Sequence, residues 1–274
     1  MKIYFLTPEI FPFSNTSFLS MFSKFVPINL QKNNHDIRLT SPKYGFISER
    51  KYTLREVIRL REINTKIGEG FEVASAKSAF IPKTRVQVYF MEHENFFQPL
   101  TPLLYKAKNG RPLPDNGDRF GFFSKMSLEM LVNLFWSPNL IICNDWHSSF
   151  VPIVYEQLFS NQDFYKNIKT IQIIHNLDDY NNVPSSLYSE LGVTLPEDFK
   201  DDEINSIMVG SYFADLVIAI DNKNKSISKE IIKNKKFHNK IKNKFHIIDL
   251  NNEDEESCEI ISDQINDLIK ETFE

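Results

Sequence analysis

Two apolar runs of the chain each lead into a histidine, so their ends are the first candidates for chemistry. Leu140–His147 reads Leu-Ile-Ile-Cys-Asn-Asp-Trp-His, and Thr170–Leu177 reads Thr-Ile-Gln-Ile-Ile-His-Asn-Leu. Short runs rich in β-branched residues predict buried strands, and ligands of open α/β sheets bind beyond the carboxyl ends of such strands. The candidate catalytic groups are therefore Asp145, His147 and His175.

The elements that must position these groups alternate along the chain. We predict strands at 2–6, 36–40, 140–144, 169–175, 216–220 and 245–250, and helices at 19–30, 119–136, 149–160, 203–213, about 222–236 and about 257–273. Strands that alternate with helices in this way predict an α/β fold with a single doubly wound parallel sheet.

One part of the chain departs from that alternation. Period-two patterning in Glu56–Ile63 and Arg85–Phe90 predicts a strand-rich insertion at about 51–115. Pro99–Pro114 contains four prolines and predicts a loop. No repeat or linker interrupts the chain, so we predict one domain over 1–274.

Composition excludes several classes of protein. The 274 residues are 42% hydrophobic and 25% charged with a net charge of −4, which predicts a globular chain without a general attraction to nucleic acid. Lys223–Lys244 holds nine lysines, but its isoleucines predict a solvated helix with a buried face. No apolar run is long enough to cross a membrane. Cys143 and Cys258 are predicted to be reduced thiols in a cytoplasmic protein, and no metal or cofactor is expected because no Cys/His cluster has ligand spacing.

Several segments together resemble one family of enzymes. Thr7–Leu19, placed after the first strand, is similar to the opening of bacterial glycogen synthases and plant starch synthases, which share Ser-Glu, an aromatic-Pro step and Lys-Thr-Gly-Gly-Leu. Further segments resemble that family in the same order: His35–Arg38 with Pro42–Gly45, Leu113–Phe123, Asn144–His147, His175–Leu177 and Tyr212–Ile218. The similarity spans roughly residues 1–220.

The resemblance implies a fold and an activity. Members of this family are two-domain glucosyltransferases of the GT-B fold that move glucose from ADP-glucose to an α-1,4-glucan. Their N-terminal domain holds the acceptor, and their C-terminal domain carries most of the nucleotide site, including a basic pair beside the diphosphate. Because the chain ends at Glu274, the resemblance implies the Rossmann-like N-terminal half without the C-terminal domain.

The family's donor loop is altered in this chain. Its lysine and two glycines align with Asn15, Ser17 and Phe18. The lysine's charge is lost, and side chains stand where glycine allows the backbone a close approach and conformational freedom. An acidic residue of the family aligns with Met21, and its Ser-Pro-x-Tyr turn reads Asp-Asn-Lys-Asn at 221–224. We therefore expect weak or absent binding of ADP-glucose.

The resemblance also assigns binding residues. It implies that Asp145 and His147 orient a sugar hydroxyl and that His175 points toward the donor sugar. The substrate-binding residues that it implies, in the loop before the first helix, in an acceptor groove and after the second histidine strand, are Asn15, Thr16, Asp115, Asn116, Arg119 and Asn176.

Each of these assignments has a structural alternative. Asp145 is a candidate cap of helix 148–160, with His147 packed at the first turn. Without a donor site, His175 is a candidate for a hydrogen bond within its own loop. Asp115 or Asp118 is a candidate helix start.

Three functions remain open. The first is one half of a glucosyltransferase that depends on a separate C-terminal-domain partner or on a homo-oligomer and binds an α-glucan acceptor. The second is a degenerate, non-catalytic module that binds glucan, sugar nucleotide or protein and regulates a partner. The third, a stand-alone enzyme with another substrate, is disfavoured because phosphate contacts are missing. We expect no nucleic-acid or membrane partner and no autonomous activity.

Overall fold

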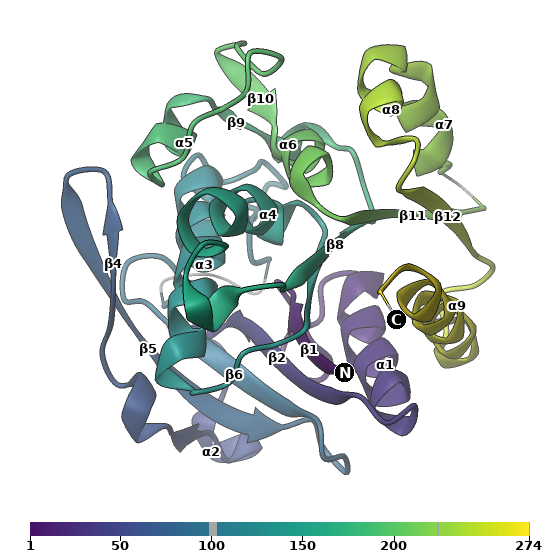
Figure 1. Ribbon diagram of the computed structural model, residues 1–274. Coiled ribbons are helices and arrows are strands. Elements are labelled where there is room, and N and C mark those ends of the chain that lie inside the picture. The colour runs from purple at the N-terminus through teal and green to yellow at the C-terminus, as the bar shows by residue number, and fades with distance from the viewer. Residues whose placement is uncertain (99–102, 224, 274) are drawn as a thin grey trace.

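The computed structural model describes residues 1–98, 103–223 and 225–273 (Figure 1). Four residues of the predicted proline-rich loop, 99–102, lie outside this part of the chain. A ten-stranded sheet runs in the order β12-β11-β8-β7-β1-β2-β6-β5-β3, with β4 paired to β5. Its strands are β1 (Lys2–Leu6), β2 (Asp36–Pro42), β3 (Arg55–Glu56), β4 (Ile63–Ile67), β5 (Gly70–Phe80), β6 (Gln87–Glu92), β7 (Leu140–Asn144), β8 (Lys169–Ile174), β11 (Leu216–Asn222) and β12 (Phe245–Leu250).

Parallel pairing dominates this sheet and confirms the predicted fold class. Every neighbouring pair from β12 to β6 is parallel, whereas β3, β4 and β6 each pair with β5 in the antiparallel direction. The chain leaves β1 toward β2 on one side and later builds β7, β8, β11 and β12 on the other. Right-handed crossovers that run in opposite directions put helices on both faces of the sheet, as a doubly wound fold requires.

The period-two region supplies antiparallel strands as well as one parallel strand. Within Glu56–Ile63, Glu56 ends the two-residue β3, a 3₁₀ turn spans Ile58–Leu60, and Ile63 begins β4. The turn buries Leu60 and leaves Ile58 exposed, which an unbroken alternation did not reveal. β6 pairs in parallel with β2 and therefore belongs to the main sheet.

Helices cover the sheet and connect its strands. They are α1 (Phe18–Lys32), α2 (Glu49–Tyr52), α3 (Asn116–Asn133), α4 (Val151–Val154), which continues as a π-helical turn, α5 (Ser186–Glu190), α6 (Ser206–Phe213), α7 (Ile227–Lys233), α8 (Lys235–Ile241) and α9 (Glu255–Phe273). A short antiparallel pair, β9 (Asn182–Pro184) with β10 (Glu203–Asn205), lies apart from the main sheet. None of the described helices is long and apolar enough to cross a membrane.

The lysine-rich segment forms two helices instead of the single predicted one. Asn234 ends α7, and its side chain accepts a hydrogen bond from the backbone N–H of Phe237 at 3.2 Å. An asparagine that satisfies the first N–H groups of a new helix interrupts the old one at that point. Ile227 and Ile231 are buried as the predicted apolar face requires, whereas Ile232, expected on the same face, is exposed.

The final helix packs lengthwise beside the first one. Figure 1 shows α9 alongside α1, with both chain termini nearby. Four apolar side chains of α9 are buried there, namely Cys258, Ile261, Ile265 and Ile269. The side-chain carbonyl oxygen of Asn266 accepts a hydrogen bond from the imidazole Nε2–H of His35 at 2.8 Å. Cys258 and Cys143 are both free and buried.

Candidate functional site

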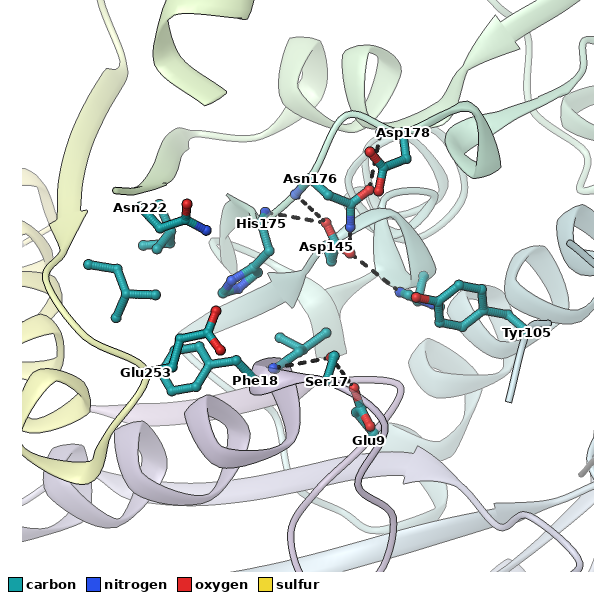
Figure 2. Close-up of a pocket in the computed structure, with 14 residues that line it drawn as sticks. Glu9, Ser17, Phe18, Tyr105, Asp145, His175, Asn176, Asp178, Asn222 and Glu253 are labelled. Carbon is teal, nitrogen blue, oxygen red and sulfur yellow. Dashed lines mark hydrogen bonds and ion pairs between the residues drawn. The ribbon is translucent and has the colours of Figure 1, made fainter. Parts of the chain in front are cut away.

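A pocket of about 230 Å³ opens at the carboxyl ends of the parallel strands (Figure 2). The loops after β1, β7, β8 and β12 contribute to it, together with the last residues of β11. The order of the chain reverses between β1 and β7, which is the switch point where doubly wound folds bind ligands. The lining residues are Glu9, Ser17, Phe18, Leu19, Tyr105, Asp145, His147, His175, Asn176, Asp178, Ile220, Asn222, Leu250 and Glu253.

Asp145 lies at the centre of this pocket and ties two strand ends together. Its carboxylate accepts hydrogen bonds from the backbone N–H groups of His175 and Asn176, each at 3.3 Å, and from the side-chain amide of Asn176. It caps no helix with its side chain, so the capping interpretation does not describe it. Burial raises the pKa of Asp145 to about 7, because an ion is costly away from water.

The backbone of Asp145 is strained. Its φ of 58° with ψ of −171° is a region that costs roughly 1–3 kcal/mol for residues other than glycine. The bonds from the carboxylate to the β8 loop offset that cost. They also fix the turn that delivers His147 into the pocket.

Two further contacts support the segment after β7. The side-chain amide of Gln172 donates to the carbonyl of Asp145 at 3.1 Å. Gly210 of α6 lies so close that an added Cβ would sit 2.4 Å from the carbonyl oxygen of Ser149. Only a glycine allows this approach without displacing the neighbouring backbone, so α6 packs directly against the turn after β7.

His147 is buried without a hydrogen-bond partner. The residue is 1% exposed, and neither ring nitrogen makes a hydrogen bond to any described group. The ring stacks on Trp146 with centroids 3.9 Å apart and meets Phe120 edge to face at 4.5 Å. Nδ1 lies 3.8 Å from the Asp145 carboxylate. Burial holds the pKa of His147 well below its usual value, so the ring is neutral.

His175 is the second neutral imidazole of the site. Its ring packs edge to face on Phe22 at 4.6 Å, and burial lowers its pKa to about 3. Nε2 has no hydrogen-bond partner within the described chain. Nε2 therefore makes no bond within its own loop, and the backbone N–H of His175 binds Asp145 in the loop after β7. Figure 2 shows the His175 ring directed into the cavity.

The loop before α1 is held by Glu9. The Glu9 carboxylate, 1% exposed as a residue, accepts from the backbone N–H of Thr16 at 2.7 Å, from the Thr16 hydroxyl at 3.0 Å and from the Ser17 hydroxyl. Asn15 accepts from the hydroxyl of Ser20 at 2.7 Å. Neither Asn15 nor Thr16 lines the pocket, whereas Ser17 and Phe18 do.

The structure places Asp115, Asn116 and Arg119 behind the pocket wall. Arg119 pairs with Asp115 and donates to the carbonyl of Phe96, while the side-chain amide of Asn116 donates to the carbonyl of Tyr105 at 3.0 Å. None of the three lines the cavity. Asp115 precedes the first residue of α3, although its side chain makes no capping bond. Through Asn116 this group positions Tyr105, whose ring does line it.

Several lining residues were missed by the sequence analysis. Glu9 lies in the first quoted motif but was not singled out, and Tyr105 lies in the proline-rich segment. Asn222 is the last residue of β11, and Glu253 follows β12. The rule that ligands bind at carboxyl ends of strands identified the β7 and β8 ends, and the same rule applied to the last two strands would have found this pair.

The charges of the lining set restrict its chemistry. It contains four acidic residues, Glu9, Asp145, Asp178 and Glu253, and no lysine or arginine. Asp178 is paired with Lys225 at 2.7 Å. Among the described residues no group of three His, Cys, Asp or Glu side chains is arranged to hold a metal ion. Such a pocket can exchange hydrogen bonds with neutral hydroxyl groups but offers a phosphate no cationic side chain to pair with.

Comparison with solved structures supports the fold. The catalytic domain of starch synthase IV from Arabidopsis thaliana, solved with ADP and acarbose, superposes with a TM-score of 0.75 at 19% identity and covers 90% of this chain and 50% of that one. At this identity the likeness establishes the architecture alone.

Comparison of sequences identifies the family. Glycogen synthase of Pelodictyon phaeoclathratiforme is 30% identical over 222 residues, and that of Chlorobaculum parvum is 31% identical over 221 residues. Each alignment covers 79% of this chain and 45% of the relative, so the chain spans about half the length of the curated relatives it matches. The model of the starch synthase catalytic domain matches residues 2–243. The chain thus belongs to the starch synthase catalytic domain family.

Proposed function

We propose that this chain binds the terminal glucosyl unit of an α-1,4-glucan in the strand-end pocket and does not transfer glucose from ADP-glucose by itself. Transfer would require a partner that supplies the nucleotide site, either a separate C-terminal-domain polypeptide or another copy of the chain. Family membership supports the glucan as ligand class. The pocket's charge is the observation that carries the rest.

A nucleotide diphosphate needs positive charge or backbone N–H groups around its phosphates. The lining residues include four acids and no permanent cation. At the start of α1, the N–H of Thr16 is already taken by the Glu9 carboxylate, and the Phe18 side chain lines the cavity. Both features disfavour phosphate binding at the loop before α1, where this chain departs from the family motif.

A neutral sugar suits the same surroundings. The two neutral imidazoles can each donate one hydrogen bond and accept another, and His147 is buried without any such partner. A cavity of about 230 Å³ is smaller than the roughly 300–1,000 Å³ typical of drug-sized ligands, which favours one sugar ring over a whole nucleotide sugar. Tyr105 adds an aromatic face beside His147.

A regulatory, non-catalytic role is the second candidate. It is favoured by the structural use of both buried carboxylates, since Glu9 and Asp145 are engaged in holding loops. Under this alternative, glucan binding would alter a partner's activity without turnover. A cytoplasmic location belongs to the proposal too and is supported by the two free, buried cysteines.

Calorimetry with maltoheptaose and with ADP-glucose tests the proposal. We expect measurable binding of maltoheptaose, at least tenfold weaker binding of ADP-glucose, and no glucose transfer to glycogen by the chain alone. His147→Phe should weaken maltoheptaose binding. Micromolar binding of ADP-glucose, or robust turnover by the lone protein, would overturn the proposal. Restored turnover on adding a C-terminal-domain protein of a glycogen synthase would favour the half-enzyme over the regulator.

A further inference from the structure

The last strand of the sheet has one open edge. β12 stands at the end of the strand order, and β11 is its only strand neighbour in the described part of the chain. Figure 1 shows it at the margin of the sheet, above α9. A six-residue edge that is not covered by another strand is a template for pairing with an added chain.

The register identifies which backbone groups face outward. The N–H of Val217 donates to the carbonyl of Lys244 at 2.8 Å, and Val217 is the register partner of Phe245. Along a parallel strand, alternate residues direct their N–H and C=O groups to the same neighbour. His246 and Ile248 therefore bind β11, whereas Ile247 and Asp249 present their N–H and C=O groups to the open side.

The open edge forms one wall of a groove of about 480 Å³. Four residues of β12, from His246 to Asp249, line it together with Asn251 just beyond the strand, which indicates that the groove runs along the edge. The other wall is one stripe of α9, since its lining residues recur at helical spacing: Ile260, Gln264, Asp267, Leu268 and Glu271. Ile247 and Ile260 are each 47% exposed, so each wall offers an apolar side chain.

The groove is acidic. Asp249, Asp267 and Glu271 all line it, and it contains no lysine or arginine. None of these three carboxylates forms an ion pair with a described residue. Their field favours a segment with lysine or arginine side chains.

We propose that this groove binds an extended basic segment of a partner protein, which adds to β12 as a further strand. Main-chain hydrogen bonds to Ile247 and Asp249 would supply the pairing, as in other sheets that accept a peptide at their edge. Lysine or arginine side chains would meet the three carboxylates, and apolar ones would cover Ile247 and Ile260. A second copy of this chain fits poorly, because pairing two β12 edges brings the same acidic groups together. This interaction is separate from the sugar pocket.

Fluorescence anisotropy with a labelled peptide tests the pairing. The probe is a capped eight-residue peptide of alternating lysine and valine, with two matched controls. One control carries glutamate in place of lysine, and the other carries N-methyl groups on alternate backbone nitrogens. We expect the basic peptide to bind at least tenfold more tightly than either control at low salt, and to weaken as salt rises. Equal binding of all three peptides, or no binding, would overturn the proposal.

Variants of the chain separate backbone pairing from side-chain contact. Ile247→Pro removes an outward N–H without touching a bond to β11, and proline is tolerated on edge strands. Ile247→Ala is the matched control, because it keeps that N–H. We expect at least a tenfold loss of basic-peptide affinity for the proline variant and less than a threefold loss for the alanine variant, with both melting cooperatively.

A double charge variant completes the design. Asp267→Asn combined with Glu271→Gln should weaken binding of the basic peptide about fivefold and make that binding less dependent on salt. Unchanged affinity in the proline variant would show that no strand is added. A dimer in sedimentation experiments that Ile247→Pro dissociates would assign the edge to a second copy and overturn the partner that we propose.

Discussion

The carboxyl groups and the imidazoles of the pocket differ in what already surrounds them. Glu9 and Asp145 each accept three hydrogen bonds from neighbouring loops. His147, in the same wall, makes none, and Nε2 of His175 has no described partner. A buried polar group without a partner costs about 1–3 kcal/mol. The acids therefore build the pocket, while the imidazoles are the groups left to bind a ligand.

The carboxyl groups and the imidazoles should differ most in how they make the free energy of unfolding depend on pH. Asp145 has a pKa of about 7 in the folded chain against a model value of 3.8. Between these values the folded state holds a proton that the unfolded state has released, so stability falls as pH rises from about 4 to 7. The effect is on the order of 4 kcal/mol. Urea unfolding of Asp145→Asn beside the parent protein, from pH 4 to 8, should show that this slope has gone.

His175 should make the free energy of unfolding change with pH in the opposite direction. The pKa of His175 is lowered to about 3 from 6.5, so the unfolded chain binds a proton that the folded chain does not between these values. Stability therefore rises with pH over that window, by an amount of similar order. His175→Gln should remove the rise. If the two variants changed the pH dependence of stability in the same direction, the contrast between Asp145 and His175 would be wrong.

Removing the Asp145 carboxyl group comes next in size. Asp145→Ala leaves the backbone N–H groups of His175 and Asn176 buried without partners, and we expect a loss of about 2 kcal/mol in the free energy of unfolding at pH 5. Asp163→Ala is the matched control, since that exposed carboxylate pairs only with Lys166 and should cost less than about 0.5 kcal/mol. If the two variants unfolded alike, Asp145 would have no structural role.

The ends of β7 and β8 could be predicted because the signal is local. Each strand is a short apolar run, and the residues that follow it lie within a few positions of its end. The strained backbone of Asp145 and its bonds to the β8 loop were not predictable, because they join residues 30 and 31 positions apart. The alternative role of Asp145 as a helix cap followed from its position before the expected helix alone.

The remaining errors have similar physical causes. Tyr105 enters the pocket because Asn116 holds its carbonyl, a contact that no pattern in the sequence announces. The split of the lysine-rich helix depends on one capping side chain, Asn234, and an asparagine within a polar run is easily taken for a solvated helix residue. A side-chain contact, rather than periodicity, decided the outcome in each case: one to a loop and one local helix cap.

His147→Phe should change binding more than folding. Phenylalanine keeps an aromatic ring against Trp146 and Phe120 and removes two nitrogens that have no partner, so stability should stay within about 1 kcal/mol of the parent protein. Loss of one or two hydrogen bonds to a sugar should weaken maltoheptaose binding about tenfold. Calorimetry and urea unfolding of the same variant measure both quantities. Full retention of affinity would mean that the ligand does not reach this ring.

The smallest effect is expected at the rim. Glu253 lines the pocket but is exposed, and the free energy of an exposed charge is only a few tenths of a kcal/mol because water screens it. Glu253→Gln should therefore change maltoheptaose affinity by less than about twofold. A loss as large as that of His147→Phe would show that the ligand bonds directly to this carboxylate. The residues that bind the ligand would then include Glu253, after the end of β12, as well as the two imidazoles.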